Sequence, residues 1–191
     1  MKFLLRISLI IFFLAPIFFS CANDMNVVNK FIDTEIEPDV LSENVELLYS
    51  DSAKLQVKML APLVKLFSSA KEQRKEFPEG IHVWFYEKTG ELKAEITANW
   101  AKHDEVADLW EAQSNVVITH ANGDKLETEQ FFWDTKKGIV YSEKYTKMTQ
   151  EDGSMASGES FSANQDFTDM KFIRGKATIM INDEEKPENQ P

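Results

Sequence analysis

The sequence predicts an all-β fold, an elongated body in which antiparallel strands form two facing sheets. Apolar and β-branched residues alternate with polar ones along much of the chain, as expected for half-buried strands. The alternating runs are separated by the turn dipeptides Thr89-Gly90, Asn122-Gly123 and Asp152-Gly153. Such dipeptides favour hairpins because their residues tolerate a positive φ angle. The three glycines recur at intervals of 33 and 30 residues, a period typical of stacked units that bury their apolar faces against one another. Coincidence among ordinary hairpins is the alternative explanation of this repeat.

The first twenty residues have the parts of a secretory signal peptide. Lys2 and Arg6 precede an apolar run, Ile7–Phe19, and a small residue stands before Cys21. The run of about 13 residues is shorter than the roughly 20 that a membrane-spanning helix needs. The segment resembles a bacterial lipoprotein signal, in which the cysteine thiol is acylated and becomes the new N-terminus. The alternatives are a lone buried thiol and an uncleaved short anchor.

A polar tether, one folded domain and an acidic tail are expected after this segment. Residues 21–43 are polar and form the tether, and residues 44–181 form the domain. Its first strands are expected around Val45–Tyr49 and Leu55–Met59, where every second residue is apolar. Residues 182–191 have almost nothing to bury, so we expect a disordered tail.

Two stretches of the domain depart from simple alternation. Leu60–Lys75 carries apolar residues at helix-like spacing, and Pro62 is tolerated in a first helical turn. We therefore expect a short helix or an irregular excursion there. Trp100–Trp110 has too few apolar residues for a helix, and we expect two strands around a turn near His103 and Asp104.

The register of the hairpins decides which residues face inward. Two-residue loops at the second and third turns pair Thr119 with Leu126 and Gln150 with Met155, and cross-strand partners share a face. Three-residue loops would send each set to the opposite face. The residues predicted to face inward, and so to line an apolar groove, are Val57, Met59, Val83, Phe85, Leu92, Ile96, Val117, Leu126, Phe131, Trp133, Ile139, Met155 and Phe161, with Met148 also on the inner face. The same pattern is also typical of a closed sandwich with a solidly packed interior.

Composition and charge exclude several classes of protein. The 191 residues include 21 Lys+Arg against 32 Asp+Glu, and a formal net charge of −11 does not suit nucleic-acid binding. One cysteine forms neither an internal disulfide nor a cysteine-based zinc site, and the three histidines match no ligand spacing, so we expect no metal or cofactor. The chain has no Gly-x-Ser-x-Gly, His-Glu-x-x-His or phosphate-loop motif. Glu129 and Glu159 recur in the repeat, which suits a structural corner better than a catalytic acid. We therefore expect no enzymatic activity.

Six segments carry a family resemblance. They are Phe77–Val83, Leu109–Ala112, Asn115–Val117, Gly123–Gly138, Val140–Lys144 and Gly158–Phe167. Together they look like LptC, the periplasmic, inner-membrane-linked component of lipopolysaccharide export, in the form found in Bacteroidetes-type bacteria. The resemblance spans roughly residues 40–181. The chain departs from it at Cys21, where many members carry a transmembrane anchor, and at Ser154–Gly158, which is one residue longer.

The resemblance implies a twisted, open β-jellyroll with a transport role and no enzymatic activity. Such a protein accepts lipopolysaccharide from an inner-membrane ABC transporter. It passes the lipid through an apolar groove to a same-fold periplasmic bridge protein. The resemblance also implies a periplasmic location, with the N-terminus anchored to the inner membrane. Unpaired edge strands can be extended by a partner strand, so we expect the edge near Val45–Tyr49 to meet the transporter and the edge near Phe172–Ile181 to meet the bridge protein.

The main alternative is a generic surface lipoprotein with a closed β-barrel that binds a partner or a small apolar ligand. The two readings differ in whether the sheets close at both ends, because sheet-continuing partners require free edges. Since lipopolysaccharide is anionic and the chain is acidic, we expect only acyl chains to enter the groove.

Overall fold

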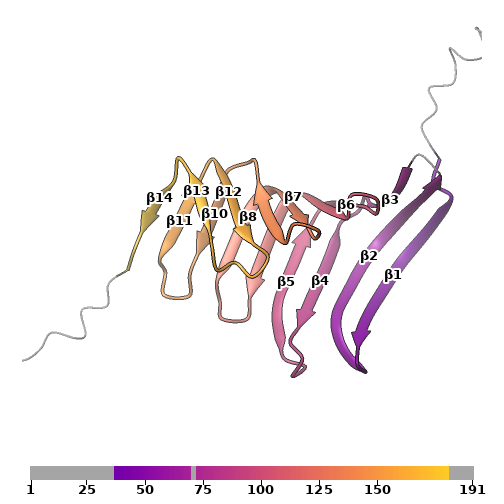
Figure 1. Cartoon of the computed structure of the whole chain (residues 1–191), viewed down its shortest axis with the longest axis horizontal. Coiled ribbons are helices and arrows are strands. Elements are labelled where there is room, and N and C mark those ends of the chain that lie inside the picture. Colours follow the sequence, from indigo (N-terminus) through magenta and orange to yellow (C-terminus); the bar gives the residue numbers. More distant parts are fainter. Residues whose placement is uncertain (1–36, 70–71, 181–191) are drawn as a thin grey trace, which may run out of the picture. The chain divides into compact units, whose positions relative to one another are not determined.

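The computed structural model describes residues 37–69 and 72–180, which form fourteen strands stacked from β1 at one end to β14 at the other (Figure 1). In chain order the strands are β1 (Val40–Asp51), β2 (Lys54–Ser69), β3 (Glu72–Phe77), β4 (Ile81–Tyr86), β5 (Leu92–Ala98), β6 (Trp100–Asp104), β7 (Leu109–His120), β8 (Lys125–Asp134), β9 (Ile139–Ser142), β10 (Thr146–Thr149), β11 (Met155–Gly158), β12 (Ser160–Asn164), β13 (Lys171–Ile173) and β14 (Lys176–Thr178). These described residues contain no helix with the length and hydropathy to cross a membrane.

One continuous antiparallel sheet folds into two layers because its longest strands change partners along their length. β2, for example, pairs with β4 over Val57–Leu60 and with β3 over Lys65–Ser69. β7 and β8 change partners in the same way. The order is β1-β2-β4-β5-β7-β8-β10-β11-β14 in the first layer and β1-β2-β3-β6-β7-β8-β9-β12-β13 in the second. Paired residues in these ladders are at most about 30 positions apart in the sequence, as Arg74 and Asp104 are.

The stack is open at both ends. In the described part of the chain, β1 pairs on one side only, with β2, and the same is true of β13 with β12 and of β14 with β11. The expectation of an open, twisted all-β jellyroll is therefore confirmed. The closed barrel of the alternative reading is wrong for this chain.

The strands bend between layers where the backbone takes a left-handed conformation. Asn44 in β1, Asn115 in β7 and Arg174 between β13 and β14 have φ angles of 51°, 53° and 50°. Asparagine tolerates this region better than most side chains. Gly80, with φ of 90°, makes the corner between β3 and β4, and a Cβ there would lie 2.4 Å from the carbonyl oxygen of Ala98. Only glycine fits at that corner.

The three glycine turns are hairpins, as predicted, but each loop has three residues, where two had been predicted at the second and third turns. In each loop the glycine N–H donates to the carbonyl oxygen three positions earlier, at 2.8 Å for Gly90, 2.9 Å for Gly123 and 3.0 Å for Gly153. This is the geometry of a turn followed by a glycine in a bulge, which adds one residue to the loop. The register therefore shifts by one, so that Ile118 lies opposite Leu126, and the predicted register is wrong.

The internal repeat corresponds to hairpins that lie side by side in the first layer. Their turns project along one margin of the stack (Figure 1). Glu129 and Glu159 lie where the chain leaves the first layer for the second, which agrees with a corner role. The aromatic residues two positions later, Phe131 and Phe161, are buried.

The expectation of a helix or excursion over Leu60–Lys75 is wrong, because this segment contains the end of β2 and the start of β3. Burial alternates there with period two: Met59 and Ala61 are buried while Leu60 and Pro62 are exposed. Pro62 lies opposite Asn44, at a position where the β1–β2 ladder has no pair. Its missing N–H therefore removes no ladder hydrogen bond.

Two boundaries differ from the sequence expectations. β1 begins at Val40, so the last four residues of the expected tether belong to a strand. Two strands do occupy Trp100–Trp110, but the turn between them lies after Asp104. The Asp104 carboxylate accepts the N–H of Ala107 at 2.7 Å, which stabilises that turn.

Candidate functional site

Apolar rows run across the inner faces of both layers. The first-layer row crosses from β1 to β10 through Leu47, Met59, Val83, Ile96, Ile118, Leu126 and Met148. The corresponding second-layer row is Phe77, Ala101, Ala112 and Phe131. Two alanines between two phenylalanines leave space that larger side chains would fill.

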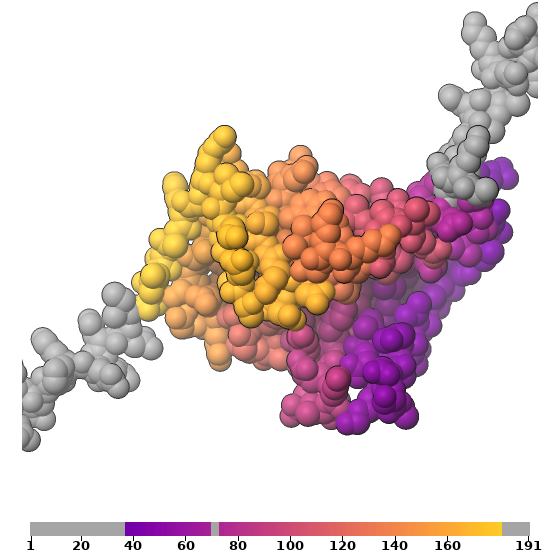
Figure 2. Space-filling model, viewed as in Figure 1, coloured from indigo at the N-terminus to yellow at the C-terminus, as the bar shows by residue number. Residues whose placement is uncertain are grey.

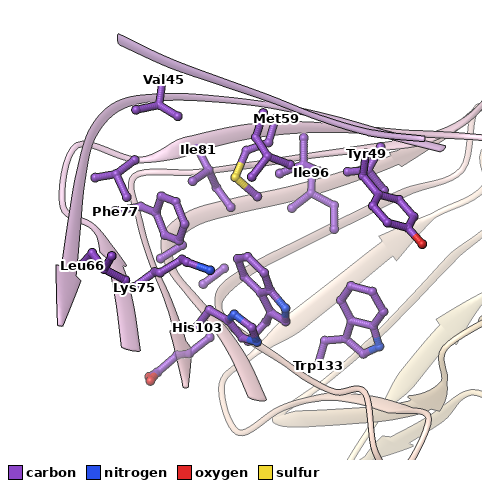
Figure 3. Close-up of a pocket in the computed structure, with 18 of the residues that line it drawn as sticks. Val45, Tyr49, Met59, Leu66, Lys75, Phe77, Ile81, Ile96, His103 and Trp133 are labelled. Atoms are coloured by element: carbon purple, nitrogen blue, oxygen red, sulfur yellow. The ribbon is translucent and has the colours of Figure 1, made fainter. Parts of the chain in front are cut away.

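A cavity of about 520 Å³ occupies this space at the β1 end of the stack (Figure 3). Strands β1 to β8 all contribute to its lining. Val45 and Tyr49 reach it from β1, and Trp133 lies at its far side (Figure 3). An edge-on contact between Phe85 and Trp133, 6.2 Å between ring centroids, joins the two layers there. The cavity wall is almost entirely apolar.

Seven of the thirteen predicted groove residues line this cavity. They are Val57, Met59, Val83, Phe85, Ile96, Phe131 and Trp133. Alternation alone placed them on the inner face, and the structure brings them together from β2, β4, β5 and β8.

The other six predicted groove residues lie elsewhere. Leu126 and Phe161 are 1% and 2% exposed and lie in the core between the layers without lining the cavity. Leu92 lies at the start of β5 and is 41% exposed. Val117 and Met155 face outward because of the three-residue loops, and Ile139 faces outward because its neighbour Val140 pairs with inward-facing Trp133.

A second set of lining residues was missed by the sequence reasoning. It includes Lys75 from β3, His103 from β6 and Trp110 from β7, which occupy consecutive positions across the second layer. Lys75 lies two positions before Phe77 and so shares its face of β3, but a charged side chain gives no apolar signal, and the segment was expected to be a helix or an irregular excursion. His103 was missed because a turn was predicted there, whereas the residue lies in strand β6.

The basic residues of the described lining are both compensated by acidic partners. Lys75 Nζ lies 2.6 Å from Glu105 Oε1, and His103 Nε2 lies 3.0 Å from Asp108 Oδ1. The His103 ring also stacks on Trp110 at 4.2 Å. Hydrogen bonds from Thr135 and His103 hold the pKa of the Asp108 carboxyl below its usual value. This margin of the cavity is therefore polar, with each basic side chain in contact with an acidic one, while its interior is apolar.

Two buried ring nitrogens, Nε1 of Trp133 and Nε2 of His120, have no hydrogen-bond partner in the described part of the chain. Burial lowers the pKa of His120, with Asp124 opposing and Lys93 reinforcing the shift. Within residues 37–69 and 72–180, no three His, Cys, Asp or Glu side chains are grouped to hold a metal ion.

A concave, mostly apolar cavity of this size has the character of a binding site for an apolar ligand. The family model for lipopolysaccharide-assembly, LptC-related proteins matches residues 8–175, and the chain belongs to this family. Members are non-enzymatic transport components, periplasmic and membrane-associated. Membership implies lipopolysaccharide binding and a role in its transport with the Lpt machinery. No curated protein matches the chain. The signal segment, Cys21 and the acidic tail lie outside the described residues.

Proposed function

We propose that this chain accepts lipopolysaccharide from an inner-membrane ABC transporter, shelters its acyl chains in the cavity, and passes it to a same-fold periplasmic bridge protein. The observation that carries the proposal is an apolar cavity of about 520 Å³ in an unclosed sheet. We also propose that the chain is of the Bacteroidetes-type form of the family, because the six segments named in the sequence analysis resemble that form.

The energetics of acyl chains favour such a carrier. Removing each methylene from water is worth about 0.8 kcal/mol, so a chain of about 12 carbons in water costs on the order of 10 kcal/mol. A cavity of about 520 Å³ falls in the range of about 300–1,000 Å³ typical of ligand pockets. Acyl chains therefore enter, and the anionic head group of the lipid stays outside an acidic protein.

The free edges at the two ends of the stack support partner binding by strand addition. β1 carries twelve residues, and its Leu41 and Leu48 are exposed. At the other end Ile173 and Ile179 are exposed beside β13 and β14. We assign the β1 edge to the transporter and the β13–β14 edge to the bridge protein, because continuing a sheet satisfies its unpaired backbone groups.

The N-terminus supplies the membrane attachment in this proposal. Acylation of Cys21 after removal of residues 1–20 would tether the domain to the inner membrane from the periplasmic side, and an uncleaved apolar segment is the alternative anchor. Incorporation of a radiolabelled fatty acid by the native chain, and its loss in Cys21→Ser, distinguishes the two forms of attachment.

Photo-crosslinking from neighbouring positions of β8 tests the lipid path. A benzoylphenylalanine at Phe131 faces the cavity, whereas one at Phe132 faces outward, where that ring stacks on Tyr141 at 4.8 Å. We expect lipopolysaccharide adducts at Phe131 and background labelling at Phe132, with Glu127 as a second outward control. Equal labelling at inward and outward positions would contradict the proposal.

A further inference from the structure

A strap of chain leaves the second layer after β12, contacts the first layer, and returns to the second layer at β13. The strap, residues 164–170, runs from the last residue of β12 to β13. The Gln165 N–H donates to the carbonyl oxygen of Gly138 in the second layer at 3.0 Å. Asp166 Oδ1 lies 3.7 Å from Nζ of Lys93, on β5 of the first layer. In Figure 2 the golden residues of this region spread across the front of the molecule.

Phe167 inserts from the strap into the space between the layers. Its ring meets the His120 ring edge-on at 5.0 Å and stacks with Phe131 at 6.4 Å and Phe161 at 6.2 Å. Phe131 also lines the cavity. Phe167 therefore stands directly behind the cavity wall, between the hollow half of the stack and the β14 end.

The strap is tied to the first layer by one ion pair and by the ring contact of Phe167 with His120. Phe167 has a φ angle of 57°, which is unfavourable for a bulky side chain. The Asn164 side chain accepts the N–H groups of Thr168 and Asp169 at 2.8 and 3.2 Å, so the strap keeps its own hydrogen bonds when it leaves the first layer. Its ion pair to the first layer joins two exposed side chains, and such pairs are weak. His120 Nε2, beneath the ring, gains access to water when the strap lifts.

We propose that the strap is a latch: closed, Phe167 blocks the path from the cavity to the β14 end, and opening removes Phe167 from that path. The latch rests on the proposed function, because the path that it controls is that of an acyl chain. An open latch lets the chain advance toward the β13–β14 edge, and a closed latch confines it to the cavity.

Calorimetric measurement of the binding of saturated fatty acids of increasing length to the full-length protein tests whether Phe167 blocks the path. Each methylene that enters an apolar site tightens binding about fourfold, the equivalent of about 0.8 kcal/mol. In the native chain we expect this gain to stop once the tail reaches Phe131. In Phe167→Ala we expect it to continue over several further methylenes. Fatty acids with a diazirine at the last carbon locate the tail, which should label β2 and β4 in the native chain and additionally β10–β12 in the variant.

A pair of charge variants tests the latch without disturbing the core. Asp166→Lys repels Lys93, whereas Asp169→Lys makes the same charge change at a strap residue whose partner, Lys171 at 3.4 Å, adjoins the strap at the start of β13. We expect Asp166→Lys to extend the length limit and Asp169→Lys to leave it unchanged, even if Phe167→Ala does not fold. The same length limit in Asp166→Lys as in the native chain, or labelling of β10–β12 in the native chain, would overturn the latch alone. Absence of fatty-acid binding by the native chain would overturn the proposed function and the latch with it.

Discussion

Replacing Ile118 by alanine tests the register of the central hairpin, because the next residue back along β7, Val117, faces the opposite way. Ile118 is 1% exposed and lies between Ile96 of β5 and Leu126 of β8. Loss of a fully buried side chain of this kind costs about 2–5 kcal/mol, from lost burial plus the hole that remains. Val117 lies opposite Glu127 on the outer face, where Val→Ala costs about 1 kcal/mol or less.

Thermal unfolding followed by circular dichroism measures the difference between the two variants. A cost of about 3 kcal/mol lowers Tm by about 6–12 °C in a body of this size, so we expect such a drop for Ile118→Ala and a drop of a few degrees at most for Val117→Ala. A two-residue loop at Gly123 would reverse the order of the two variants. That reversed order would refute the register and with it the assignment of the inner face.

Three further predictions follow from the corner, the cavity and the buried histidine. Gly80→Ala should destabilise the fold by more than about 2 kcal/mol in urea unfolding, because its Cβ would meet a backbone carbonyl oxygen at 2.4 Å. Gly90→Ala, whose Cβ would enter open space, should cost about 1 kcal/mol. Equal costs for the two variants would contradict the close packing at the Gly80 corner. Ile96→Glu places a charge in the cavity and should weaken fatty-acid binding at least tenfold, while Thr97→Glu on the opposite face should not; similar losses in both would point to a site elsewhere. The folded state lowers the pKa of His120 below 6.5, so the unfolded chain binds this proton first and stability should fall as the pH drops through and below about 6.5. His120→Gln should flatten that part of the pH profile measured by urea unfolding, and an unchanged profile would assign the dependence to other groups.

The hairpins were predictable from sequence because turn chemistry is local. Gly90, Gly123 and Gly153 mark the loops, and each has the positive φ that the turn requires. The number of residues in each loop was not predictable from the dipeptide alone, because a glycine bulge adds one without changing the residues that signal the turn. That single residue moved Val117 and Met155 to the outer face.

The cavity was predictable in its first layer, but in its second layer only at Phe131 and Trp133. Val57, Met59 and Val83 follow plain alternation, so sequence reasoning placed them correctly on the inner face. The second layer depends on Ala101 and Ala112, whose contribution is the volume that they leave empty. A small residue gives no apolar signal of its own, so the hollow emerges only when the layers are brought together.

Every described ladder joins segments that are near neighbours along the chain, and this order has a consequence for how the protein comes apart. Each strand depends on the strands beside it and on none from the far end, much as in a solenoid, so loss of structure can spread inward from either terminus. Amide exchange should therefore be slowest around β7 and β8, which contact strands in both layers, and progressively faster toward β1 and β14. A strand supplied by another protein at either end would slow exchange there first, which makes the fraying ends sensitive reporters of assembly.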